Sequence, residues 1–417
     1  MPGGLLLTLS LVALAATLVT AIARPPWLPE AVVAIVLAAG LVAIGAVSVD
    51  RAREAVDHLA TTIGFLAALL LLADGCRREG LFRALGSLMA RGAGNSPRRL
   101  LALVFAVASG VTIALGLDPT IVLLTPVVLA TATYLRMSPE PDVFATAHLA
   151  NSASLLLPVS NLTNLLVFDL TSLTFTHFAL LMLLPTLGAI GVEWFVLNRF
   201  FAAELGRPSE QESETAVPHF SRLALGVLSA TLVGFIVGSL FGVPPLWIAA
   251  AGAVAITVPA LVRRSEGPIA VVRALEPSFL GFVLGLGVIV VAASDNGLGT
   301  TVRTVLPGGT SLPALLGIAG ISALLANLVN NLPAILVVGP VAAASGNAAV
   351  AAALLGVNIG PNLTYTGSLA TLLWRRLLRA EDVDVNLGEF LRLGVLTVPA
   401  ALVLSTLLLW SAGKVGL

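Results

Sequence analysis

The sequence predicts an all-α polytopic membrane protein built from two inverted-topology repeats, and three observations support this prediction. The first is composition, because 58% of the 417 residues are hydrophobic and 11% are charged, whereas a soluble domain carries roughly 25% charged residues. The second is a series of apolar runs long enough to cross a bilayer. The third is a likeness between two proline-broken stretches, GLDPTIVLLTPVVLA (116–130) and NNLPAILVVGPVAAA (330–344), which align at an offset of 214 positions. Each repeat should therefore hold a re-entrant helical hairpin and a discontinuous transmembrane helix, which gives about ten full crossings plus two hairpins.

The uninterrupted apolar runs mark the full crossings, since a spanning helix needs about 20 mostly apolar residues. They lie at 4–23, 29–48, 58–75, 178–199, 223–242, 246–262, 276–293 and 390–412. The first run has no basic segment before it, which favours a transmembrane helix over a signal peptide. The segment 78–92 mixes Arg with Leu and Phe and predicts an amphipathic helix in the interface plane. Four further apolar regions are interrupted by polar residues, prolines or glycines: 100–135, 143–169, 311–347 and 348–374.

The orientation and the domain boundaries follow from charge. Most arginines fall on one face if 100–135 and 311–347 are hairpins that leave the bilayer where they began, and this face is then cytoplasmic. Only Arg51, Arg53, Arg303 and Lys414 fall on the other face, and both chain ends lie outside. The polar segment 204–222 reads as a cytoplasmic linker. The chain divides into N-terminal transmembrane helices (1–50), a first inverted repeat (51–203), this linker (204–222) and a second inverted repeat (223–417).

Polar residues collect at the four interrupted regions. Irregular backbone survives at membrane depth only inside protein or beside a watery cavity, so these breaks are expected to surround one small polar site. Ser160-Asn161-Leu162-Thr163 aligns with Pro361-Asn362-Leu363-Thr364 at an offset of 201, which pairs the two interrupted helices. The alternative is that the same side chains only form hydrogen bonds between helices. The candidate substrate-binding residues are Asn151, Ser152, Ser154, Ser160, Asn161, Thr163, Asn330, Asn331, Asn358, Asn362 and Thr364.

The predicted site is almost uncharged. No Arg or Lys lies within the four segments between their ends, which suits a small neutral polyol-like solute better than a dicarboxylate, sulfate or phosphate. The exception is Asp118 at the first hairpin tip, and an ionisable residue at membrane depth is a functional hypothesis by default. We expect Asp118 to bind and release a proton, and its alternative role is to cap the returning helix. His148 is a weaker candidate for a proton relay, and a packed or interfacial histidine is the more conservative expectation there.

Other site classes find no support in the sequence. The single cysteine, Cys76, excludes an intramolecular disulfide and a cysteine-cluster metal site, and four scattered histidines argue against zinc. The formal net charge of zero gives no electrostatic case for nucleic acid. No nucleophile–base pair or metal-ligand spacing occurs, so we expect neither an enzyme nor a cofactor.

Four segments carry a resemblance to a known family. LDPTIVLLTPVV (117–128), ANSASLLLPVSNLTNLL (150–166), NLVNNLPAILV (327–337) and GPNLTYTGSLATLLW (360–374) resemble bacterial arsenite efflux permeases of the ArsB type, within the ion transporter superfamily. The resemblance implies an antiporter of the bacterial inner membrane that exports trivalent arsenic, and often antimony, as the neutral hydroxide in exchange for protons. Members of that family often carry Asp at the positions of Asn151 and Asn358, and Lys at that of Asn362. The site here has therefore lost charge, which gives Asp118 a larger part in proton coupling.

Two other functions and two partners stay open. An anion or carboxylate carrier of the same superfamily is possible, although the site has no cation. A passive channel for small neutral solutes is another, although hairpins that open from both faces favour alternating access. The resemblance decides neither a soluble arsenical-pump ATPase partner nor a homodimer.

Overall fold

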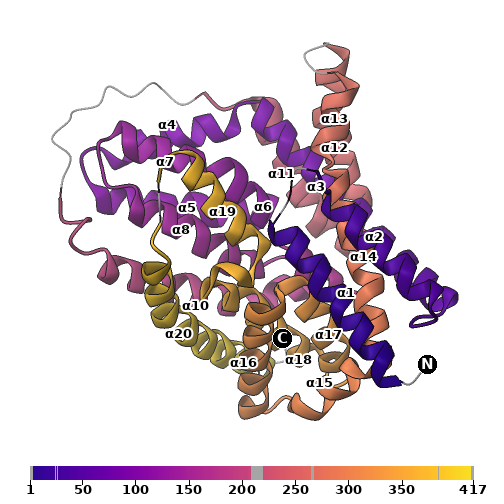
Figure 1. Ribbon diagram of the computed structural model, residues 1–417. Helices are drawn as coiled ribbons and strands as arrows, with labels where there is room; N and C mark the ends of the chain where they lie inside the picture. The colour runs from indigo at the N-terminus through magenta and orange to yellow at the C-terminus, as the bar shows by residue number, and fades with distance from the viewer. Residues whose placement is uncertain are drawn as a thin grey trace.

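The helices of this computed structural model confirm the predicted fold class. The structure describes residues 3–23, 25, 27–207, 219–263, 267–383 and 385–414. Every regular element in these ranges is a helix, and ten helices are long and apolar enough to cross a membrane (Figure 1). The chain is an all-α polytopic membrane protein with the predicted hairpins and discontinuous helices.

One group of long helices packs along one side of the molecule. Helix α14 (Pro277–Ala293) contacts α1 (Gly3–Ala23), α2 (Glu30–Ala43) and α3 (Val49–Arg78), and α12 (Pro245–Val262) packs between α3 and α11 (Arg222–Leu240). Helix α2 is shorter than the predicted run 29–48, because the chain turns at Gly45 with φ of 75°. Helix α3 begins before the predicted 58, since Ser48 accepts a hydrogen bond from the Arg51 amide and caps a charged first turn.

The first repeat contains the predicted hairpin. The amphipathic helix α4 (Leu81–Ala93) leads into α5 (Pro97–Leu115), and the chain reverses at Gly116. The returning arm consists of α6 (Leu117–Pro119), a π-helical turn (Thr120–Leu124) and α7 (Thr125–Tyr134). Gly116 has φ of 98° and ψ of 175°, a backbone region that is essentially restricted to glycine.

The first discontinuous helix follows this hairpin. Helix α8 (Glu140–Ser152) ends in two short 3-10 turns, Ala153–Leu155 and Pro158–Ser160, and the chain resumes as α9 (Leu162–Phe168). Asn161 caps α9, because its side chain accepts a hydrogen bond from the Thr163 amide at 3.1 Å. Helix α10 (Phe175–Phe200) then completes the repeat.

The second repeat has the same order of elements. After α13 (Pro268–Ala274) and α14 come a π-helical turn (Ser294–Leu298) and α15 (Gly299–Val305), and the hairpin is α16 (Leu312–Val329) and α17 (Asn331–Ala343), with Asn330 at its tip. The discontinuous helix is α18 (Asn347–Ile359), two 3-10 turns (Gly360–Asn362 and Tyr365–Gly367) and α19 (Leu369–Ala380). Helix α20 (Leu387–Lys414) packs along α10 (Figure 1).

The structure corrects the register that relates the two discontinuous helices. Helices α8 and α18 each have 13 residues and begin 207 positions apart. Asn161 and Ser368, the residues that cap α9 and α19, are also 207 positions apart. The two 3-10 turns of each break are 207 positions apart as well, since Ala153–Leu155 corresponds to Gly360–Asn362 and Pro158–Ser160 to Tyr365–Gly367. The offset of 201 inferred from the sequence is therefore wrong, because it matched polar letters at the end of the first break with polar letters at the start of the second. The predicted linker, 204–222, lies largely outside the described residues, and the domain boundaries remain predictions.

Candidate substrate and proton site

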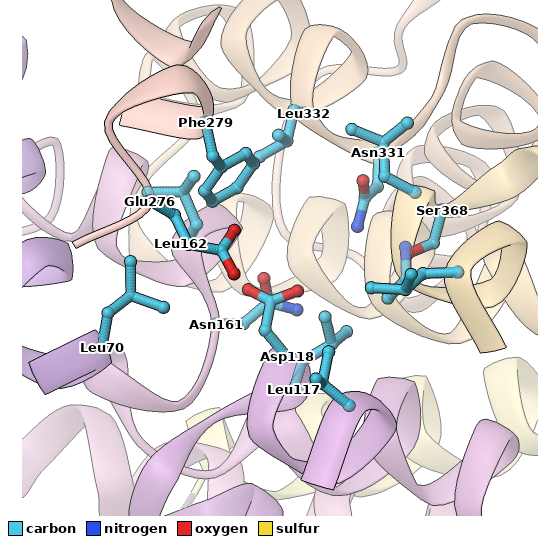
Figure 2. A pocket seen from close by; sticks show the side chains of 14 residues that line it. Leu70, Leu117, Asp118, Asn161, Leu162, Glu276, Phe279, Asn331, Leu332 and Ser368 are labelled. Atoms are coloured by element: carbon cyan, nitrogen blue, oxygen red, sulfur yellow. The ribbon is translucent and has the colours of Figure 1, made fainter. Parts of the chain in front are cut away.

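One cavity lies where the two hairpin tips and the two resumed helices meet. Its volume is about 210 Å³. Its lining comes from the tips after Gly116 and Asn330, from the first turns of α9 and α19, and from α3 and α14 (Figure 2). The lining residues are Leu70, Leu117, Asp118, Val122, Asn161, Leu162, Glu276, Phe279, Asn331, Leu332, Ser368, Leu369, Ala370 and Leu373.

Helix N-termini make this cavity polar despite its many leucines. Asn161 caps α9, Ser368 accepts a hydrogen bond from the Ala370 amide at 3.2 Å, and Asn330 accepts one from the Leu332 amide at 3.4 Å. Each cap satisfies one amide of its helix, and the remaining amides of the first turn lack partners within the helix. These ends carry partial positive charge and present donors to oxygen atoms.

Two carboxylates face each other in this cavity. Figure 2 shows the carboxylate oxygens of Asp118 and Glu276 turned toward one another from opposite walls. Asp118 is half-buried in the first turn after the hairpin tip. The N-cap of the returning helix is Gly116, so Asp118 does not have the capping role that was its alternative. Glu276 is exposed and precedes α14 in a left-handed conformation with φ of 48°, which is uncommon for any residue other than glycine.

Glu276 was not predicted as a site residue, because it stands at the edge of the apolar run 276–293. A signal was present, since Glu276-Pro277 begins that run and proline favours the first position of a helix. The chemistry of the cavity is set by carboxylates, amides, a hydroxyl and apolar walls. None of its lining residues in the described part of the chain is a lysine or arginine.

The structure separates the predicted site residues into two groups. Asp118, Asn161 and Asn331 line the cavity, and Asn330 forms the tip beside it. Ser160 lies one residue before this lining and donates to the Ile113 carbonyl at 2.7 Å. The remaining predicted residues lie in hydrogen-bond networks outside the cavity: Asn151, Ser152, Ser154, Thr163, Asn358, Asn362 and Thr364.

The first network surrounds Asn358. Its side-chain oxygen accepts hydrogen bonds from Asn161 at 3.1 Å and Thr163 at 2.6 Å, and its nitrogen donates to Asn164 at 2.8 Å. Ser154 accepts from the other Asn161 proton at 3.0 Å. These bonds hold the start of α9 against the end of α18, so this network joins the two repeats.

The second network surrounds Asn362. The side-chain oxygen of Asn362 accepts a hydrogen bond from Asn151 at 2.8 Å. The side-chain nitrogen of Asn362 donates to Ser152 at 3.1 Å and to Glu193 at 3.0 Å. Helix α20 packs closely here, because a Cβ on Gly394 would lie 2.4 Å from the Asn362 carbonyl oxygen. This network joins the break of the second repeat to α8 and α10.

The two networks are related by the internal repeat. Asn151 and Asn358 are equivalent by the 207-residue register, as are Asn164 and Thr371. Asn151 lies 3.5 Å from Thr371, and Asn358 lies 2.8 Å from Asn164. Each asparagine therefore contacts the resumed helix of the other repeat. Thr364 is separate, since it donates to Asn327 at 2.6 Å.

Two other residues that the sequence singled out lie elsewhere. Cys76 is fully buried in the core around α3. His148 is packed, as the conservative expectation had it, and its ring lies against Glu193 and Phe390.

Comparison with known proteins places the chain in a family. The family model described as citrate transporter matches residues 11–363. The chain belongs to the citrate transporter family. It is a multi-pass transporter of the inner membrane, as its relatives and the ten apolar helices within the described residues show.

Individual relatives carry a narrower description. The transporter is 29% identical to an arsenical pump membrane protein of Yersinia enterocolitica over 93% of this chain and 95% of that protein. It is also 29% identical to an arsenical pump membrane protein of Escherichia coli, over 82% of this chain and 84% of that protein. The YdaH transporter of Alcanivorax borkumensis shares the fold with a TM-score of 0.53 and 15% identity, over 93% of this chain and 97% of that one.

Proposed function

We propose that this transporter exports arsenite in exchange for protons, that it also accepts antimonite, and that each substrate crosses as the neutral trihydroxide. The observation that carries the proposal is the cavity, in which two carboxylates and the amides of Asn161 and Asn331 surround a space without a lysine or arginine. Arsenous acid carries three hydroxyl groups, each of which donates and accepts hydrogen bonds. Carboxylate and amide oxygens would accept from these hydroxyls, and helix N-terminal amides would donate to them.

Competition for the carboxylates would produce the exchange. An ionised Asp118 accepts hydrogen bonds from the hydroxyls of the substrate, and a protonated Asp118 offers a weaker acceptor. A state that holds the proton then binds arsenite less well. Bound arsenite weakens proton binding by the same factor, because coupling between two binding sites is reciprocal. Glu276 follows the Arg-containing segment 263–273, which the distribution of arginines assigns to the cytoplasmic face. The exposed carboxylate would therefore exchange protons with cytoplasmic water.

The test is transport in proteoliposomes with an imposed pH gradient. The protein should accumulate arsenite and antimonite against their gradients when protons flow the opposite way. Asp118→Asn should lower the accumulation at least about tenfold for each pH unit, which is the effect of one lost proton on a coupled equilibrium. The matched control is Asp57→Asn on α3, because Asp57 is exposed and does not line the cavity. Absent arsenite flux, or flux that ignores the gradient, would exclude the proposal.

A carboxylate carrier is the second candidate, and one observation favours it. Several helix N-termini meet at the cavity, and such ends attract anions. Asp118 and Glu276 oppose that attraction unless they are protonated. Counterflow of labelled citrate, with and without a divalent cation, distinguishes the two candidates. Citrate counterflow that arsenite does not inhibit would support the second candidate.

A further inference from the structure

A buried pair of ionisable residues lies outside the cavity. The Nδ1 atom of His148 on α8 is 2.8 Å from the Oε2 atom of Glu193 on α10, and both side chains are fully buried. The other carboxylate oxygen of Glu193 accepts hydrogen bonds from Ser152 at 3.1 Å and Asn362 at 3.0 Å. Burial of a carboxylate at membrane depth is costly, so a site that supplies it with three hydrogen-bond partners is a functional candidate.

The hydrogen bonds define where another proton can bind. The Asn362 amide donates to the Oε1 atom of Glu193 and its oxygen accepts from Asn151, so Oε1 is an acceptor. When Glu193 is ionised, Oε2 is an acceptor too, and the single proton of a neutral imidazole then lies on Nδ1. The Nε2 atom of His148 has no hydrogen-bond partner in the described structure although it is buried. One proton on Nε2 would change the pair from a net charge of −1 to neutral.

Within the described residues, no third ionisable group hydrogen-bonds to this pair. The Phe390 ring centroid lies 5.6 Å from that of His148. None of the other ionisable groups on the helices packed around the pair hydrogen-bonds to His148 or Glu193 within the described ranges. These groups are Glu140 and Asp142 on α8, Arg98 and Arg99 on α5, His177 and Arg199 on α10, Arg222 on α11, Arg375, Arg376 and Arg379 on α19, and Glu389, Arg392 and Lys414 on α20.

A chain of hydrogen bonds runs from the pair to α19, whose first turn lines the cavity. Glu193 bonds to Asn362, Asn362 bonds to Asn151, and Asn151 lies 3.5 Å from Thr371 on α19. The first turn of α19, from Ser368 to Ala370, lines the cavity. A change of charge at Glu193 therefore acts on side chains that hold the cavity-lining end of α19.

We propose that the His148–Glu193 pair is a proton-binding site that gains and loses one proton during each transport cycle. This inference rests on the proposed proton exchange and adds a second proton site to it. Protonation of Nε2 reduces the negative charge that Ser152 and Asn362 stabilise, and the weaker pull on Asn362 relaxes its bond to Asn151. The carried proton and the position of α19 are thereby linked.

Nitrogen NMR of the imidazole tests the site without any transport measurement. His58, His177 and His219 are replaced by glutamine, so that His148 is the only labelled histidine. The ¹⁵N shift of Nε2 should change from the neutral to the protonated value as the pH is lowered from about 8 to about 5, the interval in which an unperturbed imidazole changes its charge. The same change should be absent or displaced in Glu193→Gln. A His148 ring that keeps one protonation state across this range overturns the proposal.

The second measurement is the number of protons moved per arsenite in the transport assay. His148→Gln and Glu193→Gln should each move one proton fewer, which lowers the accumulation about tenfold per pH unit. The double variant replaces the pair by two neutral amides and keeps the inference testable if a single variant does not fold. His177→Gln on α10 is the control, because His177 is exposed. An unchanged ratio overturns this inference, whereas absent arsenite exchange at equal pH overturns the proposed function itself.

Discussion

At the scale of single residues, the cavity combines two carboxylates that differ in exposure and in backbone strain. Asp118 is half-buried, and Glu276 is exposed and left-handed with φ of 48°. Non-glycine residues in such conformations cost about 1–3 kcal/mol each and concentrate at functional sites. Asparagine adopts the left-handed region more readily than glutamate. The backbone role of Glu276 can therefore be separated from the role of its charge.

Substitution of Glu276 by asparagine should separate the effect of its charge on transport from the effect of its backbone conformation on stability. We expect Glu276→Asn to melt at or above the wild-type temperature, because asparagine relieves backbone strain. Arsenite accumulation driven by a pH gradient should nevertheless fall about tenfold per pH unit if the two carboxylates share one proton. Glu381→Gln is the control, since Glu381 is an exposed glutamate that does not line the cavity. Full coupling in Glu276→Asn would show that Asp118 works alone.

At the scale of elements, the two hairpin tips share one unusual backbone conformation. Gly116 has φ of 98° and ψ of 175°, and Asn330 has φ of 73° and ψ of 155°. The side chain of Asn330 offsets part of this cost, because it bonds to the Leu332 amide and to the Thr366 carbonyl, both at 3.4 Å. The tips therefore reverse the chain in the same way with different chemistry.

An alanine at the first tip should destabilise the hairpin. The Cβ of Gly116→Ala would lie 3.3 Å from the Ser160 carbonyl oxygen, in a backbone region that disfavours side chains. The expected loss is about 1–3 kcal/mol of stability, read as a lower melting temperature in detergent. Gly110→Ala is the matched control in α5, where a Cβ meets nothing within 4 Å. Equal melting of both variants would contradict the assigned strain.

At the scale of the whole molecule, networks of amides and hydroxyls hold the two repeats together. Asn358 bonds to three residues of the first repeat, and Asn362 bonds to Ser152 and Glu193. Such hydrogen bonds within a membrane bundle contribute about 0.6 kcal/mol each on average. The networks therefore specify which segments meet and add modestly to stability.

Inverted topology makes a prediction about the accessibility of the two loops that precede the hairpins. In a Cys76→Ala background, cysteine is placed at Asn95 before α5 or at Thr310 before α16, both of which are exposed. A membrane-impermeant maleimide added to intact cells should label Thr310→Cys and leave Asn95→Cys unlabelled until the membrane is opened. Labelling of both positions in intact cells would contradict an inverted repeat.

Much of the architecture could be predicted from the chain alone. Apolar run length gave the spanning helices, and the prolines, glycines and asparagines within those runs marked both hairpins and both discontinuous helices. The equivalence between the discontinuous helices could not be predicted, because the breaks Ala153–Ser160 and Gly360–Gly367 share the same pair of 3-10 turns but hardly any residues. A local match of polar letters therefore aligned the end of one break with the start of the other.

The sequence by itself determined the membrane class, the order of elements and the segments that form the site. It did so because hydrophobicity and backbone-breaking residues act locally. The tertiary structure alone decided which polar side chains face the cavity. Asn151 and Asn362 turn to each other across 211 positions, and Glu276 turns into the cavity from the start of α14. Such choices depend on the packing of segments that are distant in the chain, and no local pattern records that packing.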